Sequence, residues 1–134
     1  MAHKNAEEAI EARLRANWTH CRIFTENLEE EQPTAGEPFL QLQFPFSDVQ
    51  RWSVGTKLYR EEGAFRITMS IPRGTGTQTI RDWGEELRNI FLDQKFDGVD
   101  CKVPSDPFSD DRSDAGSFYV AYIACPFIYQ WRVA

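Results

Sequence analysis

The sequence predicts an α+β fold in which a mainly antiparallel sheet packs against two helices as a two-layer sandwich. Apolar residues recur every three or four positions in two segments, as in amphipathic helices. Three other segments alternate in polarity or are apolar throughout, as strands do. Because antiparallel strand pairs and helices follow one another in groups, the order indicates an α+β protein.

The first helix is expected over residues 5–18, where an apolar stripe faces one side. The stripe consists of Ala6, Ile10, Leu14 and Trp18. Asn5 is the expected N-cap, with Glu8 at the capping-box position. A short extended piece over residues 21–25 follows, and an acidic loop over residues 26–36 ends in Pro and Gly.

Two strands are predicted over residues 39–46 and 64–72, each with one apolar face. The apolar positions are Leu40, Leu42, Phe44 and Phe46 in the first, and Phe65, Ile67, Met69 and Ile71 in the second. Residues 47–58 between them are long for a hairpin turn, and they are interpreted as a loop. Apolar residues beside basic ones suggest a contact arm, formed by Arg51, Trp52, Val54 and Lys57. A twisted hairpin whose Trp folds back onto the core explains the same residues.

The second helix is expected from a Thr75 cap to about residue 94, followed by a turn at residues 96–98. A short strand over residues 99–103 and a loop over residues 104–116 lead to a long last strand, residues 117–131. That strand is apolar on both faces, with Tyr119 on one and Tyr122 on the other. Either it is central and covered twice, or its second face meets another subunit, to which both tyrosines are candidate contacts.

Length and charge limit the function. With 134 residues, the chain is expected to form a single domain, residues 1–134. The net charge is −6 and Lys and Arg do not cluster, which argues against binding to nucleic acid, sequence-specific or not. No signal peptide is expected, because no apolar stretch follows the initiator Met, and no apolar run approaches the length of a membrane span. Three widely spaced cysteines predict reduced thiols rather than disulfides.

No residue pattern indicates catalysis, a metal or a cofactor, and the chain is predicted not to be an enzyme. The only histidines are His3, in an end expected to fray, and His20. His20 adjoins Cys21, but neighbouring residues on an extended segment point to opposite sides. Zinc-ligand spacings are missing, and the aspartates that start at Asp110 do not fit a calcium loop. The Gly-Thr-Gly-Thr at residues 74–77 lacks a nucleotide-binding pattern.

Several segments together resemble the small tail-terminator-like proteins of long-tailed bacteriophages and prophages. They are the helix end Glu-Ala-Arg-Leu-Arg-Ala-Asn-Trp (residues 11–18), the strands Pro-Phe-Leu-Gln-Leu-Gln-Phe (38–44) and Gly-Ala-Phe-Arg-Ile (63–67), Glu-Glu-Leu-Arg (85–88), Phe-Asp-Gly (96–98), Asp-Asp-Arg (110–112) and the aromatic last strand. The resemblance extends over nearly the whole chain and rests on pattern rather than on a catalytic signature.

This resemblance implies a structural protein that forms a ring, commonly a hexamer. Such a ring stops polymerisation of the tail tube and presents the surface that joins the head, while DNA passes through its lumen. The implied partners are copies of the chain itself, the tail tube protein and a head–tail connector protein. The implied locations are the bacterial host cytoplasm during assembly and then the virion tail. A small non-enzymatic adaptor that binds one protein in a bacterial cytoplasm is the alternative.

Overall fold

The computed structural model describes residues 2–25, 37–51, 55, 57–72, 78–109 and 118–132, which form two helices and seven strands. The helices are α1 (Lys4–Asn17) and α2 (Gln78–Phe91). The strands are β1 (Arg22–Thr25), β2 (Phe39–Arg51), β3 (Leu58–Pro72), β4 (Lys95–Phe96), β5 (Val99–Cys101), β6 (Phe108–Ser109) and β7 (Phe118–Arg132). Within these ranges, neither helix has the length and apolar character needed to cross a membrane.

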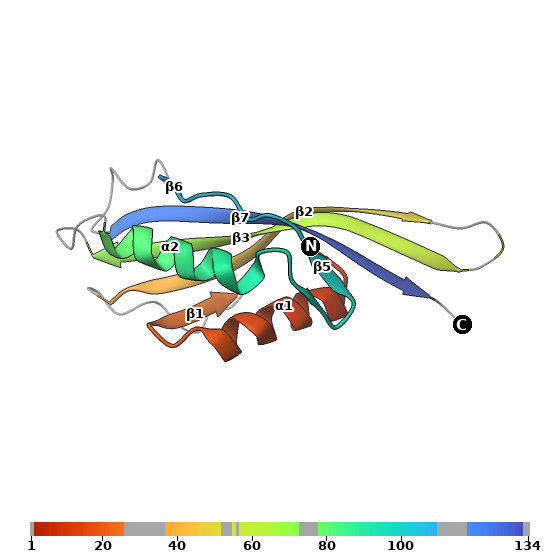
Figure 1. The fold of residues 1–134 in the computed structure, drawn as a ribbon, viewed down its shortest axis with the longest axis horizontal. Helices are drawn as coiled ribbons and strands as arrows, with labels where there is room; N and C mark the ends of the chain where they lie inside the picture. Colours follow the sequence, from red (N-terminus) through yellow and green to blue (C-terminus); the bar gives the residue numbers. More distant parts are fainter. Residues whose placement is uncertain are drawn as a thin grey trace.

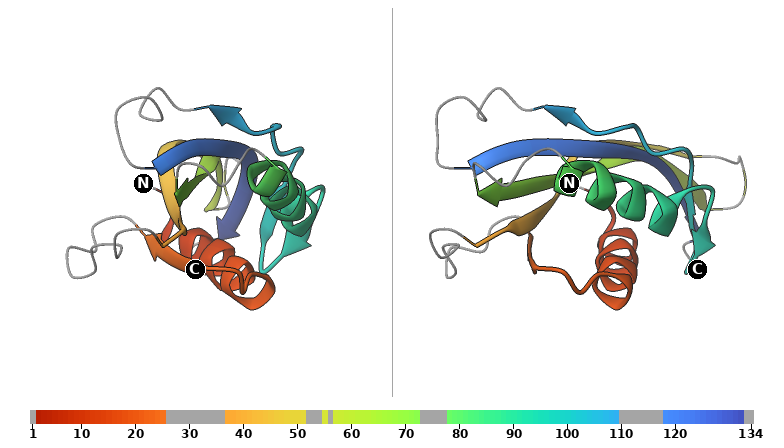
Figure 2. Two further views of the ribbon diagram at one scale, coloured as in Figure 1. Left: turned by 90° about the vertical axis from the view of Figure 1, so that its left-hand side faces the viewer. Right: turned by 60° about the vertical axis from the view of Figure 1, so that its left-hand side comes forward.

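The strands form one mixed sheet in the order β1-β2-β3-β7-β5-β4, and β6 also pairs with β7. β1 runs parallel to β2, whereas the other pairings among the described strands are antiparallel. The long last strand β7 therefore lies inside the sheet, between β3 on one side and β5 and β6 on the other. The predicted α+β class is confirmed, with a sheet that is mixed and curled (Figures 1 and 2).

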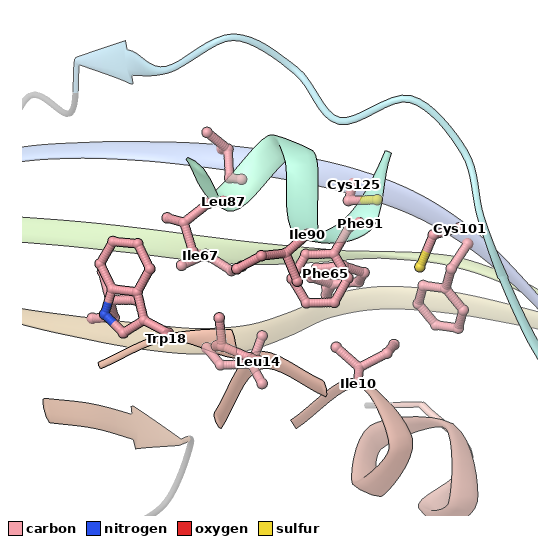
Figure 3. Close-up of a cluster of buried hydrophobic side chains, with 14 of the residues drawn as sticks. Ile10, Leu14, Trp18, Phe65, Ile67, Leu87, Ile90, Phe91, Cys101 and Cys125 are labelled. Carbon is pink, nitrogen blue, oxygen red and sulfur yellow. The ribbon is translucent and has the colours of Figure 1, made fainter. Parts of the chain in front are cut away.

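Both helices pack on one face of the sheet, here called the inner face, and the opposite one is the outer face (Figure 1). Phe65 of β3 is fully buried, and its ring lies 4.8 Å from that of Phe91 on α2. Ile10 and Leu14 approach the same cluster from α1 (Figure 3). Burial of each such side chain stabilises the fold by about 1.5–3 kcal/mol. No helix of the described chain covers the outer face.

The N-terminus of α1 differs from the prediction. The cap is His3 rather than Asn5, because the His3 Nδ1 atom accepts a hydrogen bond from the Asn5 backbone N–H at 3.1 Å. His3 was expected to fray, but its ring packs 4.5 Å from that of Trp131. The apolar stripe is confirmed: Ala6, Ile10, Leu14 and Trp18 are all buried.

The predicted loop over residues 47–58 is wrong in its first half, since β2 continues to Arg51 and β3 begins at Leu58. A β-bulge between Gln43 and Phe46 places an extra residue opposite β3. Because side chains alternate, the bulge moves Phe46 to the outer face, where it is 59% exposed. The assignment of Phe46 to the apolar face is therefore also wrong, while Leu40, Leu42 and Phe44 are buried as predicted.

The second half of the chain follows the predicted order with shorter elements. α2 ends at Phe91 rather than near residue 94, and Asp93 has a φ of 51°, a left-handed conformation that stops a helix. The Thr75 cap lies outside the described residues. β5 ends at Cys101, two residues before the predicted end. β7 is confirmed as one long strand.

Candidate protein–protein interface

Three strands continue past the helices and form a projection that we call the arm (Figure 1). It comprises residues 47–51 of β2, residue 57 with the first six residues of β3 (58–63), and residues 127–132 of β7. The rest of the described chain, where helices cover the inner face, is called the body. Gly63 and the bulge lie where the body meets the arm.

The inner face of the arm carries stacked aromatic rings. Cross-strand pairing places Arg51, Tyr59 and Trp131 in one row across β2, β3 and β7. The rings of Tyr59 and Trp131 stack at 5.7 Å, and those of Tyr129 and Trp131 also stack at 5.7 Å. Tyr59 and Trp131 are only half-buried. Such aromatic pairs add about 0.5–1.5 kcal/mol beyond their buried area.

The start of α1 covers only the base of this aromatic face. Glu61 is 2% exposed, and its carboxylate oxygens accept the backbone N–H of His3 at 3.0 and 3.1 Å. The His3 ring lies 5.1 Å from that of Tyr129. This contact joins the N-terminal segment to the arm, and Tyr59 lies beyond it, two residues closer to the arm's end.

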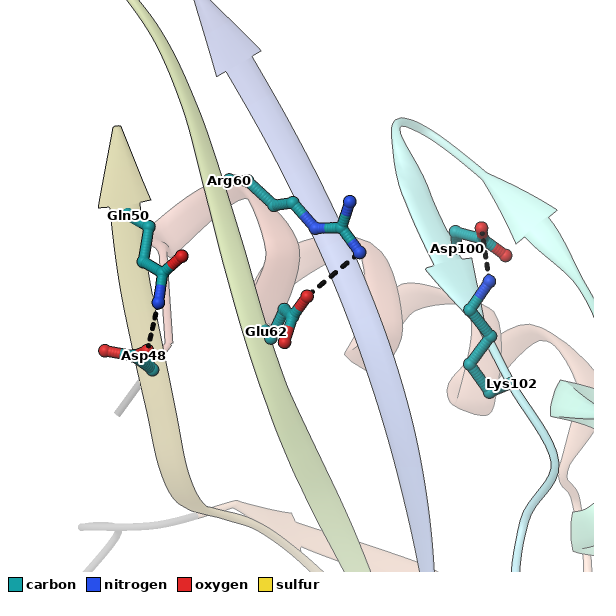
Figure 4. A network of polar contacts seen from close by, with 6 residues as sticks. All are labelled: Asp48, Gln50, Arg60, Glu62, Asp100 and Lys102. Carbon is teal, nitrogen blue, oxygen red and sulfur yellow. Dashed lines mark hydrogen bonds and ion pairs between the residues drawn. The ribbon is translucent and has the colours of Figure 1, made fainter. Parts of the chain in front are cut away.

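The outer face of the arm is polar (Figure 4). Arg60 pairs with Glu62 at 2.9 Å, and the Gln50 amide donates to Asp48 at 3.1 Å. A hollow of about 380 Å³ lies beside these residues, between the arm and the β4–β5 hairpin. Its cations are Arg60, Lys95 and Lys102, of which the first and last already pair with carboxylates. The hollow is therefore close to neutral and does not define a site for a charged ligand.

On the outer face of the body, side chains form a smaller mixed patch. The rings of Phe108 and Tyr122 lie 5.7 Å apart, and Phe108 is 53% exposed. The Arg66 guanidinium lies over the Tyr122 ring at 5.5 Å and donates twice to the Gln43 side-chain oxygen, at 3.0 and 2.7 Å. The Thr68 hydroxyl on the same face is buried and has no hydrogen-bond partner among the described residues.

The two residues that suggested a nucleophile point to different partners. The Trp18 indole N–H donates to the Cys21 sulfur at 3.4 Å, whereas His20 Nε2 pairs with a Glu86 oxygen at 2.8 Å. Burial raises the pKa of the Cys21 thiol, which disfavours the reactive thiolate. His20 and Cys21 therefore have different polar partners, Glu86 and Trp18.

The other two cysteines are free and buried in the core (Figure 3). A hydrogen bond with Cys101, together with burial, raises the pKa of the Cys125 thiol far above its ordinary value. In the described part of the chain, no three His, Cys, Asp or Glu side chains gather as a metal site requires. The candidate site is the inner face of the arm, where the stacked rings of Tyr59 and Trp131 are partly exposed.

Comparison with known proteins bears on what this face contacts. A family model described as "Phage tail terminator protein" matches residues 5–123. The chain belongs to this family. The resemblance drawn from the sequence is thereby confirmed, and it makes this terminator-family chain a structural component of a phage tail that interacts with other tail components.

No curated protein matches the chain. One solved structure shares the fold of this terminator-family chain with a TM-score of 0.65. That match covers 100% of this chain and 99% of the other at 18% identity, which supports the fold alone.

The candidate contacts of this terminator-family chain do not gather on one surface. Arg51 and Lys57 are exposed on the arm, whereas Trp52 and Val54 lie outside the described residues. Tyr119 lies on the inner face beside the start of α2, and Tyr122 lies on the outer face.

Sequence reasoning missed the aromatic face of the arm. Tyr59 and Trp131 are 72 positions apart in the sequence. Only the strand register brings them together. One signal could have indicated that the strand begins before Ala64. Tyr59, Glu61 and Gly63 are spaced two residues apart and so lie on the same face of β3 as Phe65.

Proposed function

We propose that this chain caps the phage tail tube. It stops polymerisation of the tube protein and assembles with copies of itself into a ring, as a hexamer, at the surface that joins the head. Its partners are the tail tube protein, a head–tail connector protein and its own copies. It assembles in the bacterial host cytoplasm, becomes part of the virion tail and catalyses no reaction.

The family match over residues 5–123 is the single observation that carries this proposal. Two features of the molecule support it. The inner face of the body has a complete apolar core, so the fold does not depend on a partner there. The arm, in contrast, projects beyond that core and offers a surface for assembly (Figure 1).

The charge of the chain fits a ring through which DNA moves. A net charge of −6 gives a surface that repels phosphates, so DNA in the lumen is not retained by electrostatic attraction. The chain therefore acts on DNA passage by its shape and not by binding.

The test is tube length. The tube protein of the same phage is polymerised with and without this chain, and tubes are measured by negative-stain electron microscopy. We expect tubes of limited length that end in a ring when the chain is present. Tubes of equal length in both samples, without rings at their ends, contradict the proposed function.

The six predicted contact residues are proposed to serve this assembly in two groups. Arg51, Trp52, Val54 and Lys57 fall within residues 51–57 of the sequence, and Tyr119 and Tyr122 belong to the first half of β7. Alanine variants of each group, compared in the tube-length assay, distinguish the contributions of the two groups to assembly. Loss of rings with the first group and not the second assigns ring closure to the arm.

A further inference from the structure

The inner face of the arm is an aromatic surface that the protomer leaves partly uncovered. The cover given by α1 ends at His3, whose ring packs on Tyr129 and on one side of Trp131 and whose backbone N–H donates to Glu61. One row further along the arm, Arg51, Tyr59 and Trp131 lie side by side across three strands, and none of them is buried. Tyr, Trp and Arg are the residues that dominate binding energy at protein interfaces.

The opposite face of the same strands is different in character. It carries Gln50, Arg60, Glu62 and Gln130, with an ion pair at 2.9 Å between Arg60 and Glu62. These residues are exposed or partly exposed, and Gln50, Arg60 and Glu62 already take part in a hydrogen bond or an ion pair (Figure 4). A partner gains more from covering the aromatic inner face, because stacking and apolar burial favour association there.

Charge indicates which partner fits. Residues 49–60 contain three Lys or Arg and no Asp or Glu, and residues 126–134 contain one Arg and no acid. The whole chain nevertheless has a net charge of −6, so the remainder is more acidic than the whole. The exposed cations at the arm are Arg51, Lys57 and Arg132. The acids of the arm, Asp48, Glu61 and Glu62, lie nearer its base, so the end of the arm is basic. This end is complementary to the acidic remainder of another copy, and it repels the end of another arm.

From these observations we infer that the inner face of the arm docks on the body of a second copy of this chain, with Tyr59 and Trp131 as the central contacts. Because arm-to-arm contact joins like charges, the interface is heterologous: the arm of each copy contacts the body of the next. A repeated heterologous contact closes into a ring when its rotation allows. This inference rests on the proposed function, since it names the self-contact of the ring.

The experiment places a photo-crosslinking amino acid at one arm residue at a time. Tyr59→p-benzoylphenylalanine reports on the inner face, and Gln50→p-benzoylphenylalanine, on the outer face of the same arm, is the matched control. Each full-length chain is irradiated alone at high concentration and again on tubes of the phage's own tube protein. Crosslinked peptides are identified by mass spectrometry.

The expected result is a chain-to-chain crosslink from position 59 that maps to the body of the second copy, with little or none from position 50. A crosslink to the arm of the second copy overturns the heterologous interface. A crosslink from position 59 only to the tube protein, or no crosslink in either sample, overturns the self-contact. The proposed function is decided separately, by whether the wild-type chain limits tube length.

A second measurement uses the same two faces without a photoreactive group. The double variant Tyr59→Ala/Trp131→Ala is compared with Gln50→Ala/Gln130→Ala by sedimentation at several protein and salt concentrations. We expect self-association at least tenfold weaker in the first pair, unchanged association in the second, and weakening of the wild type by salt. Equal association of both pairs contradicts the inference.

Discussion

The body and the arm share the strands β2, β3 and β7, but different contacts hold them together. In the body, the inner face of these strands is buried under two helices, and Phe65, Ile67 and Ile123 are 1% exposed or less. In the arm, the same face carries Tyr59 and Trp131, which are half-buried and stack on each other. The inner face of the same sheet thus stays buried as far as Glu61 and Tyr129 and becomes partly exposed only at Tyr59 and Trp131.

Because of this difference, we expect the body to determine the stability of the isolated chain and the arm to determine its assembly. Substitutions in the body are expected to lower the free energy of unfolding of the isolated chain, because they remove buried contacts. Substitutions in the arm are expected to affect the isolated chain less and the assembled state more. Five predictions test that division, from the largest expected effect to the smallest.

Phe65→Ala in the body is expected to destabilise the chain by about 3–5 kcal/mol. The side chain is fully buried and contacts the rings of Phe44, Phe91 and Phe127, so its removal leaves a cavity. Tyr59→Ala in the arm is expected to lower the same free energy by only about 1 kcal/mol. Urea unfolding of both variants gives the values, and equal losses contradict the division.

Gly63→Ala, where the body meets the arm, is expected to destabilise the chain by about 1–3 kcal/mol. A Cβ at this position lies 2.8 Å from the Phe46 carbonyl oxygen and 3.2 Å from the Phe127 ring, so the backbone of β2 must shift. The neighbouring Ala64→Ser, on the outer face, is the control and is expected to change little. Thermal unfolding measures both variants. An unchanged Tm for Gly63→Ala would show that β2 and the Phe127 ring can move to accommodate the methyl group without loss of stability.

Alkaline pH is expected to destabilise the body through its thiols. The pKa of Cys125 is raised in the folded chain, whereas an unfolded thiol titrates near about 8.5. Above that pH the unfolded state loses a proton that the native state keeps, so stability falls by up to about 1.4 kcal/mol per pH unit for this thiol. Unfolding free energies between about pH 8 and about pH 9.5 should fall less steeply in Cys125→Ala than in the wild type.

Glu61→Ala is expected to cost about 1 kcal/mol, because the backbone N–H of His3 loses its acceptor. The loss should be local, so hydrogen exchange at the start of α1 becomes faster while the core strands stay protected. Glu62→Ala, whose side chain is 62% exposed on the opposite face, is the control. Unchanged exchange near Ala6 in Glu61→Ala shows that this contact does not hold the N-terminal segment.

Thr68→Val is expected to have the smallest effect, and with the opposite sign. The Thr68 hydroxyl is buried without a hydrogen-bond partner in the described chain, so replacing it with a methyl group removes an unsatisfied polar atom. A gain of up to about 1 kcal/mol is expected. A loss larger than that in urea unfolding indicates that the hydroxyl has a partner in solution.

The sequence predicts the body better than the arm for a physical reason. Helix-covered strands must alternate apolar and polar residues, so residues 39–44 and 64–72 show the period of a strand. In the arm, Asp48, Arg60 and Glu62 lie on the polar outer face, and α1 covers the inner face only at its base, so the alternation of apolar and polar residues is weak there. The bulge before Phe46 leaves no signal other than Pro45.

The candidate interface shows the same limit. Arg51 and Lys57 were recognised because they are close together in the sequence. Tyr59 and Trp131 are brought together only by the register between β3 and β7, which a single sequence does not specify. Membership of the terminator family did follow from the order of the segments, which depends on the body.

The uninterrupted pairing of β3 and β7 has a mechanical consequence. It runs without a register shift from Leu58 opposite Arg132 to Pro72 opposite Phe118, through both arm and body. A pull on the arm along the strand axis therefore acts on both backbones together, because β3 and β7 each continue from the arm into the body. Tension at the arm is carried into the body by the backbone itself.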